Sequence, residues 1–128
     1  MDLNGYQHLA GETAIYPNQV KKLTQEAEQA RDYSSIARLL DLSYVGLGLA
    51  GEAGEFANKV KKLIRDSGGI LTEENVLPLI EELGDALWYI ADASRILGFD
   101  LEVVASANLA KLANRAESGT IKGSGDER

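Results

Sequence analysis

The chain has 128 residues, 45% of them hydrophobic and 26% charged, with a net charge of −7 and a pI near 4.7. This acidic balance argues against a general nucleic-acid binder, because affinity for a phosphate backbone needs a basic surface. No apolar run approaches the roughly 20 residues that span a bilayer, and no basic region followed by an apolar one marks a secretory signal. Cysteine is absent, so we expect one cytoplasmic domain without disulfides, nucleic-acid partners or membrane contacts.

The N-terminal segment carries little functional signal. Leu3 to about Thr13 is weakly helical, and Tyr16-Pro17-Asn18 interrupts it, because proline cannot continue a helix. The segment from Val20 to Arg38 is compatible with a helix in propensity but poor in apolar residues. We interpret it as either a frayed helix or a mobile crossing.

A long helix is predicted from about Ser35 to Asp66. At roughly 100° per residue, its apolar residues form one stripe, which predicts the core face: Leu49, Ala53, Phe56, Val60, Leu63 and Ile64. A second stripe, rotated by about a third of a turn, is charged: Glu52, Glu55, Lys59, Lys62 and Asp66. Gly48 and Gly51 lie near the charged stripe and leave room for a ligand or a closely packed helix.

The next helix is predicted between a cap at Thr72 and a stop at Gly98. Asn75 only partly matches a capping box with Thr72. An apolar seam recurs at alternating four- and three-residue steps: Val76, Ile80, Leu83, Leu87, Ile90, Ser94 and Leu97. A second stripe has the 0, 3, 7, 10 spacing of the preceding helix: Glu82, Asp85, Tyr89 and Asp92.

A last helix is predicted from Leu101 to about Glu117, with Asp100 placed to cap it. Asn108, Lys111 and Arg115 share its polar face at i, i+3, i+7 spacing. Residues 118–128 are rich in glycine and serine, which predicts either a flexible tail or a flap that folds over a phosphate. We therefore place a single domain at residues 1–117.

Two pairs of acids are the main candidates for a functional site. Glu52 and Glu55 lie three residues apart, as do Glu82 and Asp85, so each pair shares one helix face. Both pairs lie about 14 to 17 Å from the turn between their helices, so an antiparallel hairpin brings them to one level. Four facing carboxylates repel one another unless a cation lies between them, and oxygen ligands suit Mg²⁺ or Mn²⁺. Solvated acidic faces, offset by nearby lysines, are the alternative that spacing alone leaves open.

Two other classes of protein fit parts of the pattern. A di-iron four-helix protein also holds its metal with carboxylates on facing helices, but it adds Glu-x-x-His ligands. The only histidine is His8, which is far from the acids in sequence, so we do not favour iron. A non-catalytic helical interaction module, with a structural cation or none, is the alternative to an enzyme.

Several stretches, in the correct order, closely resemble the MazG-type all-α nucleoside triphosphate pyrophosphohydrolases. They are Gly48-Leu49-Ala50-Gly51-Glu52-Ala53-Gly54-Glu55, Val60-Lys61-Lys62, Glu81-Glu82-Leu83-Gly84-Asp85-Ala86-Leu87-Trp88-Tyr89 and Asn108-Leu109-Ala110-Lys111-Leu112. The family's E-x-x-E and E-x-x-D motifs fall on Glu52, Glu55, Glu82 and Asp85. The resemblance spans about Leu42 to Arg115. It implies an all-α bundle of four to five helices built around an antiparallel central hairpin.

The resemblance also implies an activity: Mg²⁺-dependent cleavage of a nucleoside triphosphate, or its deoxy form, to the monophosphate and pyrophosphate, in nucleotide-pool house-cleaning. The four motif acids would hold the metal. Glu55 is our candidate to orient or deprotonate the attacking water, although the sequence does not separate it from Glu52. The preferred base is not readable from the sequence.

Candidate substrate ligands follow from the same resemblance and from the need for local cations at a triphosphate. They are Lys59, Lys62, Tyr89, Asn108, Lys111 and Arg115. Tyr89 either stacks on a base or sugar or packs between helices. The resemblance further implies a homodimer or a dimer of dimers in which subunits share the nucleotide pocket.

Overall fold

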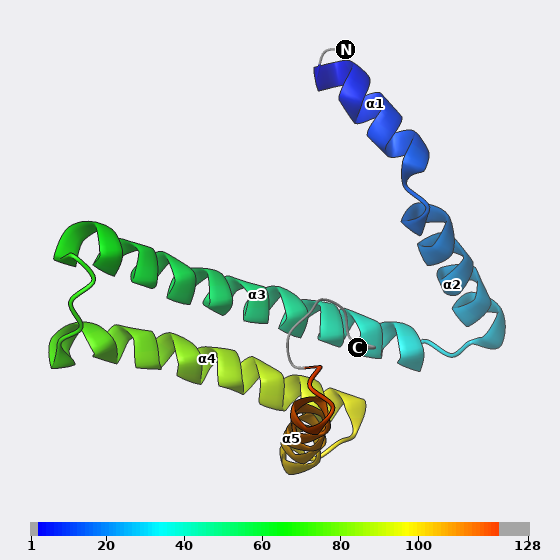
Figure 1. The fold of residues 1–128 in the computed structure, drawn as a ribbon. Helices are drawn as coiled ribbons and strands as arrows, with labels where there is room; N and C mark the ends of the chain where they lie inside the picture. Colours follow the sequence, from blue (N-terminus) through cyan, green and yellow to red (C-terminus); the bar gives the residue numbers. More distant parts are fainter. Residues whose placement is uncertain (1–2, 121–128) are drawn as a thin grey trace. The chain divides into compact units, whose positions relative to one another are not determined.

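A computed structural model describes residues 3–120 of the chain (Figure 1). The described residues form five α-helices and no strand, which confirms the all-α class. Most of the predicted tail, residues 121–128, lies outside the described residues. The chain divides into two compact units, Met1–Leu40 and Asp41–Arg128, and each is treated by itself. None of the described helices is long and apolar enough to cross a membrane.

The first unit contains α1 (Leu3–Thr13) and α2 (Tyr16–Ala30). Pro17 opens α2 instead of only ending α1, because a proline in the first turn needs no N–H partner. The polar segment expected to be frayed or mobile is thus largely a regular helix, and its Ala27 is buried. The helix ends at Arg31, whose φ of 53° is left-handed and turns the chain toward α3.

The second unit is organised by a helical hairpin. Most of α3 (Ser34–Ser67) and all of α4 (Glu73–Leu97) lie side by side and antiparallel (Figure 1). The turn uses left-handed Gly68 and Gly69, with φ of 60° and 76°. A complete capping box starts α4: the Asn75 N–H donates to the Thr72 hydroxyl at 3.3 Å, and the Thr72 N–H donates to the Asn75 side-chain oxygen at 2.9 Å. The partial match noted in sequence is therefore a full one, since an asparagine side chain can accept as glutamate does.

The last helix, α5 (Leu101–Glu117), packs against α4 after a left-handed turn at Gly98. Asp100 occupies the N-cap position as predicted, but its side chain makes no capping hydrogen bond. The expectation that Asp100 caps the helix through its side chain is therefore wrong. The loop backbone at Asp100 still supplies carbonyl partners for the N–H groups of Val103 and Val104.

The predicted apolar faces are only partly covered within the described residues of this single chain: on α3, Leu49, Phe56, Val60 and Leu63 are half-buried. Val45 on α3, at 3% exposure, and Ala27 are the buried hydrophobic residues of the described part. On the α4 seam, Ile80, Leu83 and Leu87 are each 54% exposed, and Ile64 of the predicted α3 core face is 66% exposed. The seam has the predicted spacing, but it does not form a core inside one chain.

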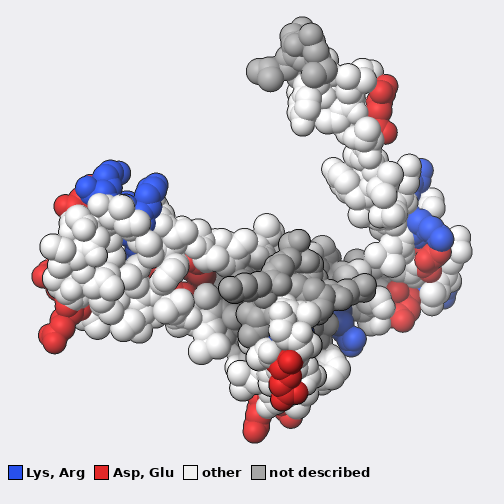
Figure 2. All heavy atoms as spheres, in the orientation of Figure 1, with Lys and Arg blue, Asp and Glu red and all other residues white. Residues whose placement is uncertain are grey.

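Charge is unevenly distributed along the hairpin. Figure 2 shows basic side chains gathered over the C-terminal end of α3, where the sequence has Lys59, Lys61, Lys62 and Arg65. Acidic side chains are visible between α3 and α4 in the same view. The C-terminal end of α3 is therefore rich in basic residues, and acidic side chains are visible at this end of the hairpin as well (Figure 2).

Candidate metal centre

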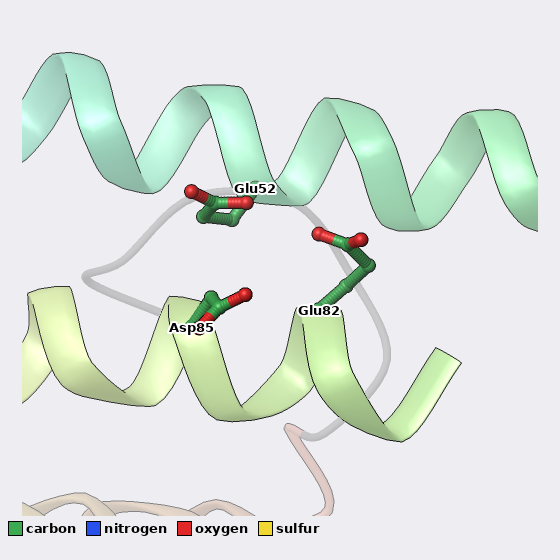
Figure 3. Close-up of side chains that lie close together, drawn as sticks. All are labelled: Glu52, Glu82 and Asp85. Carbon is green, nitrogen blue, oxygen red and sulfur yellow. The ribbon is translucent and has the colours of Figure 1, made fainter. Parts of the chain in front are cut away.

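Three carboxylates meet in the middle of the hairpin. Glu52 extends from α3, and Glu82 and Asp85 extend from α4 (Figure 3). One oxygen from each side chain lies within 4.8 Å of the others. Glu82 is buried, Glu52 is half-buried and Asp85 is exposed, so exposure to solvent differs among the three residues. The two helices bring both acidic motifs to the same level, as the distances from the turn predicted.

Glu55, the fourth predicted ligand, is not one of this group. Its side chain is exposed, and it lies close enough for its charge to act on Glu52 and Lys59. One helical turn separates Glu55 from Glu52, and that turn moves its carboxylate toward solvent. Glu55 is thus beside the cluster of Glu52, Glu82 and Asp85 rather than within it.

The cluster is electrostatically strained by its own charges. Burial raises the pKa of the Glu52 carboxyl, and its hydrogen bond to Glu82 and the negative charges around it raise that pKa further. The pKa of Glu82 is instead lowered, chiefly by a hydrogen bond from Lys59. An oxygen-only group that holds excess negative charge matches the donor set that hard divalent cations prefer. The residues present therefore fit Mg²⁺ or Mn²⁺.

Lys59 is engaged with the cluster. Its ammonium group forms an ion pair with the Glu82 carboxylate and donates a hydrogen bond of 3.1 Å to the Pro78 carbonyl. The pairing with Glu82 raises the pKa of Lys59. Lys59, which was predicted to bind phosphate, is therefore paired with Glu82, which was predicted to bind metal. Lys62, also predicted to bind phosphate, is exposed near the end of α3.

Tyr89 packs against α3 at a glycine. A β-carbon added to Gly48 would overlap the tyrosine ring, with Cδ1 at 2.8 Å and two other ring carbons closer still. The Trp88 ring meets Tyr89 edge to face at 5.0 Å. Burial raises the pKa of the Tyr89 hydroxyl, followed by charges that include Glu52 and Asp85. Tyr89 thus packs on α3 beside the cluster, and Gly48 provides the space for it.

The α5 candidates line two hollows that include none of the cluster carboxylates. Asn108 and Lys111 line an open hollow of 580 Å³ whose other residues are mostly apolar. Lys111 and Arg115 line a second hollow of 570 Å³, where Arg115 is buried. Asp85 is twelve residues from the end of α4 at Leu97, about 18 Å of helix before α5 begins.

Two features of the site escaped the sequence analysis. The first is the Lys59–Glu82 pair: the matching stripes placed both residues on facing sides, but Lys59 was assigned to phosphate. The second is the Pro78 carbonyl, which lies one helical turn before Glu82 and so presents an acceptor to the same ammonium. Backbone acceptors leave no signal in a pattern of side chains.

The described fold is an all-α hairpin, and the acidic, oxygen-only group between its helices has the donor atoms that divalent cations prefer. Comparison with known proteins identifies the family. The model of the MazG nucleotide pyrophosphohydrolase domain matches residues 42–120. The chain is also 46% identical over 128 residues to the Gene 37 protein of Mycobacterium phage L5, and the match covers all of both chains. No solved structure gives a significant match.

The chain belongs to the MazG nucleotide pyrophosphohydrolase family, which confirms the resemblance carried by its motifs. The matched segment begins on α3 just after the first unit and includes α4, α5 and the whole carboxylate cluster. The name of the phage protein does not state an activity. Family membership therefore gives the general reaction class, and the geometry of the site has to supply the detail.

The contact between Gly48 and Tyr89 generates a stability prediction. Gly48→Ala should destabilise the protein by about 1–3 kcal/mol, because the added methyl group overpacks a closed contact. Gly51→Ala is the matched control on the same helix, since nothing lies within 4 Å of its added carbon; it should stabilise by up to about 1 kcal/mol. Urea unfolding at one protein concentration measures both, and equal effects of the two substitutions would contradict the proposed contact.

Proposed function

We propose that the α3–α4 face around Glu52, Glu82 and Asp85 binds a nucleoside triphosphate and hydrolyses it between the α and β phosphates. The products are the nucleoside monophosphate and pyrophosphate, and the reaction requires Mg²⁺, with Mn²⁺ as a substitute. The observation that carries the proposal is the approach of Glu52, Glu82 and Asp85 oxygens to within 4.8 Å of one another across two helices. Membership of the MazG family supports the reaction class. House-cleaning of the nucleotide pool is the role proposed for this reaction.

The metal ligands in this proposal are Glu52, Glu82 and Asp85. A bound Mg²⁺ would offset triphosphate charge and make a coordinated water more acidic. Glu55 lies beside the cluster, exposed, which suits a carboxylate that accepts a proton from the attacking water better than one that serves as a core ligand. The choice of Glu55 over Glu52 thus gains support from the geometry: Glu52 belongs to the group of close oxygens and Glu55 does not.

Binding of the triphosphate requires cations, because the cluster itself is negative. Lys62 is proposed to contact phosphate from the basic end of α3. Asn108, Lys111 and Arg115 are proposed to contact the substrate from α5. Tyr89 is proposed to contact the substrate with the face or edge of its ring while it packs on Gly48. Lys59, the other predicted ligand, already has Glu82 as its partner.

Removal of one cluster carboxylate should abolish activity while the helices persist. Glu82→Gln and Asp85→Asn should each lower Mg²⁺-dependent pyrophosphate release at least about 100-fold, a loss that even outer-shell changes can cause at metal sites. Glu74→Gln is the control, because this exposed acid lies on the same helix outside the cluster. Release is measured across normal and modified nucleoside triphosphates. Turnover that survives in both cluster variants would contradict the proposal, and no turnover of any nucleotide by the unaltered protein would favour the non-catalytic interaction module.

We also propose that a second copy of the chain covers the apolar seam of α4. Ile80, Leu83 and Leu87 follow i, i+3, i+7 spacing and are each about half exposed, which is the pattern of a helix face that packs against another helix. A homodimer or a dimer of dimers would bury this face. It would also allow the α5 residues of one subunit to approach the cluster of the other.

The oligomer can be tested by mass in solution. Sedimentation at micromolar concentration should give at least twice the 13.8 kDa chain mass, and Leu87→Asp should shift the protein toward the single-chain mass because it places a charge in an apolar interface. Leu71→Asp is the control, since this exposed leucine lies in the α3–α4 turn, off the seam. A single-chain mass for the unaltered protein would contradict the proposal.

A further inference from the structure

We propose that Lys59 is a positioning residue that holds the Glu82 carboxylate in the cluster when no cation is bound, and that a divalent cation competes with Lys59 for this carboxylate. The inference deepens the proposed function, because it rests on the same metal site. Lys59 is thereby assigned to the metal site and not to the substrate phosphates. The ion pair with Lys59 would also offset part of the repulsion among the three carboxylates when no metal is bound.

The contacts of Lys59 connect the two helices at the cluster. Its ammonium reaches from α3 to two acceptors on α4, the Glu82 carboxylate and the Pro78 carbonyl. These acceptors lie four residues apart, on one helix face. Since an ammonium has three donors, two of them are used within the protein. A lysine whose role is to bind phosphate would not need a second acceptor on the backbone. A lysine that fixes the Glu82 carboxylate is itself held in place by such an acceptor.

Burial explains why Glu82 needs a partner. The Glu82 side chain is 8% exposed, and that of Lys59 is 31% exposed. An unpaired carboxylate at such a depth is unfavourable, because it loses water without gaining an opposite charge. Lys59 supplies that charge from the side of the turn. Glu52 and Asp85 approach Glu82 within the cluster and bring further carboxylates, not an opposite charge.

One ammonium offsets only one of the three carboxylates, so the cluster keeps negative charge that a divalent cation can neutralise. A cation that takes Glu82 as a ligand must share this carboxylate with Lys59 or displace the lysine. The two cations also repel each other at short range. Lys59 and the metal should therefore bind anticooperatively: each weakens the hold of the other on Glu82, and the coupling acts on both by the same factor.

Mn²⁺ binding without nucleotide tests this coupling in the full-length protein. Lys59→Met keeps the length of the apolar stem and removes the charge. It should lower the melting temperature in the absence of metal and tighten Mn²⁺ binding at least about fivefold, the lower end of typical coupling between sites. Lys61→Met is the matched control, since this lysine is exposed two residues away, and it should change neither quantity. Lys59→Arg keeps the charge and should bind Mn²⁺ within about twofold of the unaltered protein.

Unchanged or weaker Mn²⁺ binding by Lys59→Met would overturn the inference, as would Mn²⁺ binding by none of the variants. If Lys59→Met does not fold, labelling with an amine-reactive reagent replaces it. Mn²⁺ should then increase the labelling of Lys59 at least about fivefold relative to Lys61, and an unchanged ratio would overturn the inference. These measurements use no nucleotide, so a protein without turnover could still show the coupling, and failure of the proposed function would be recognised separately.

Discussion

Repulsion among carboxylates is the constraint on which the rest of the hairpin depends. Glu52, Glu82 and Asp85 lie within 4.8 Å across α3 and α4, and like charges at this range favour separation of the helices. The surroundings oppose that separation: Lys59 pairs with the most buried acid, and the Tyr89 ring packs closely over Gly48. The cluster is thus held together by contacts on either side, one ionic and one apolar. In this account, the arrangement keeps the three carboxylates together at the proposed cation site.

The scarcity of buried apolar residues makes the repulsion among the carboxylates harder for a single chain to oppose. Within the described part of the chain, few hydrophobic side chains are buried, and the α4 seam is about half exposed. A hairpin with so little core has little cohesion with which to hold like charges together. Association with a second copy would cover the seam. The proposed metal site and the proposed oligomer are linked in this account, because burial of the seam would also restrain α4, which carries Glu82 and Asp85.

Helical periodicity was sufficient to predict most of the fold and the level of the site. The stripes on α3 and α4 placed Glu52 opposite Glu82 and Asp85, since regular helices fix both rise and face. Periodicity did not reveal that α2 is a regular helix, because few apolar residues mark it, or that Asp100 caps without its side chain. It also could not assign the partner of Lys59, which depends on burial and on the Pro78 carbonyl. Side-chain spacing predicts which residues face each other, but burial and backbone acceptors decide how they pair.

The position of a bound divalent cation is the measurement that tests the account most directly. Mn²⁺ is paramagnetic and broadens the NMR signals of nearby amide groups. Substoichiometric Mn²⁺ should broaden the amides around Glu52 on α3 and around Glu82 and Asp85 on α4 first, and excess Mg²⁺ should restore them. Broadening confined to other acids, such as Glu73 and Glu74 at the start of α4, would contradict the account. No selective broadening at all would contradict it equally.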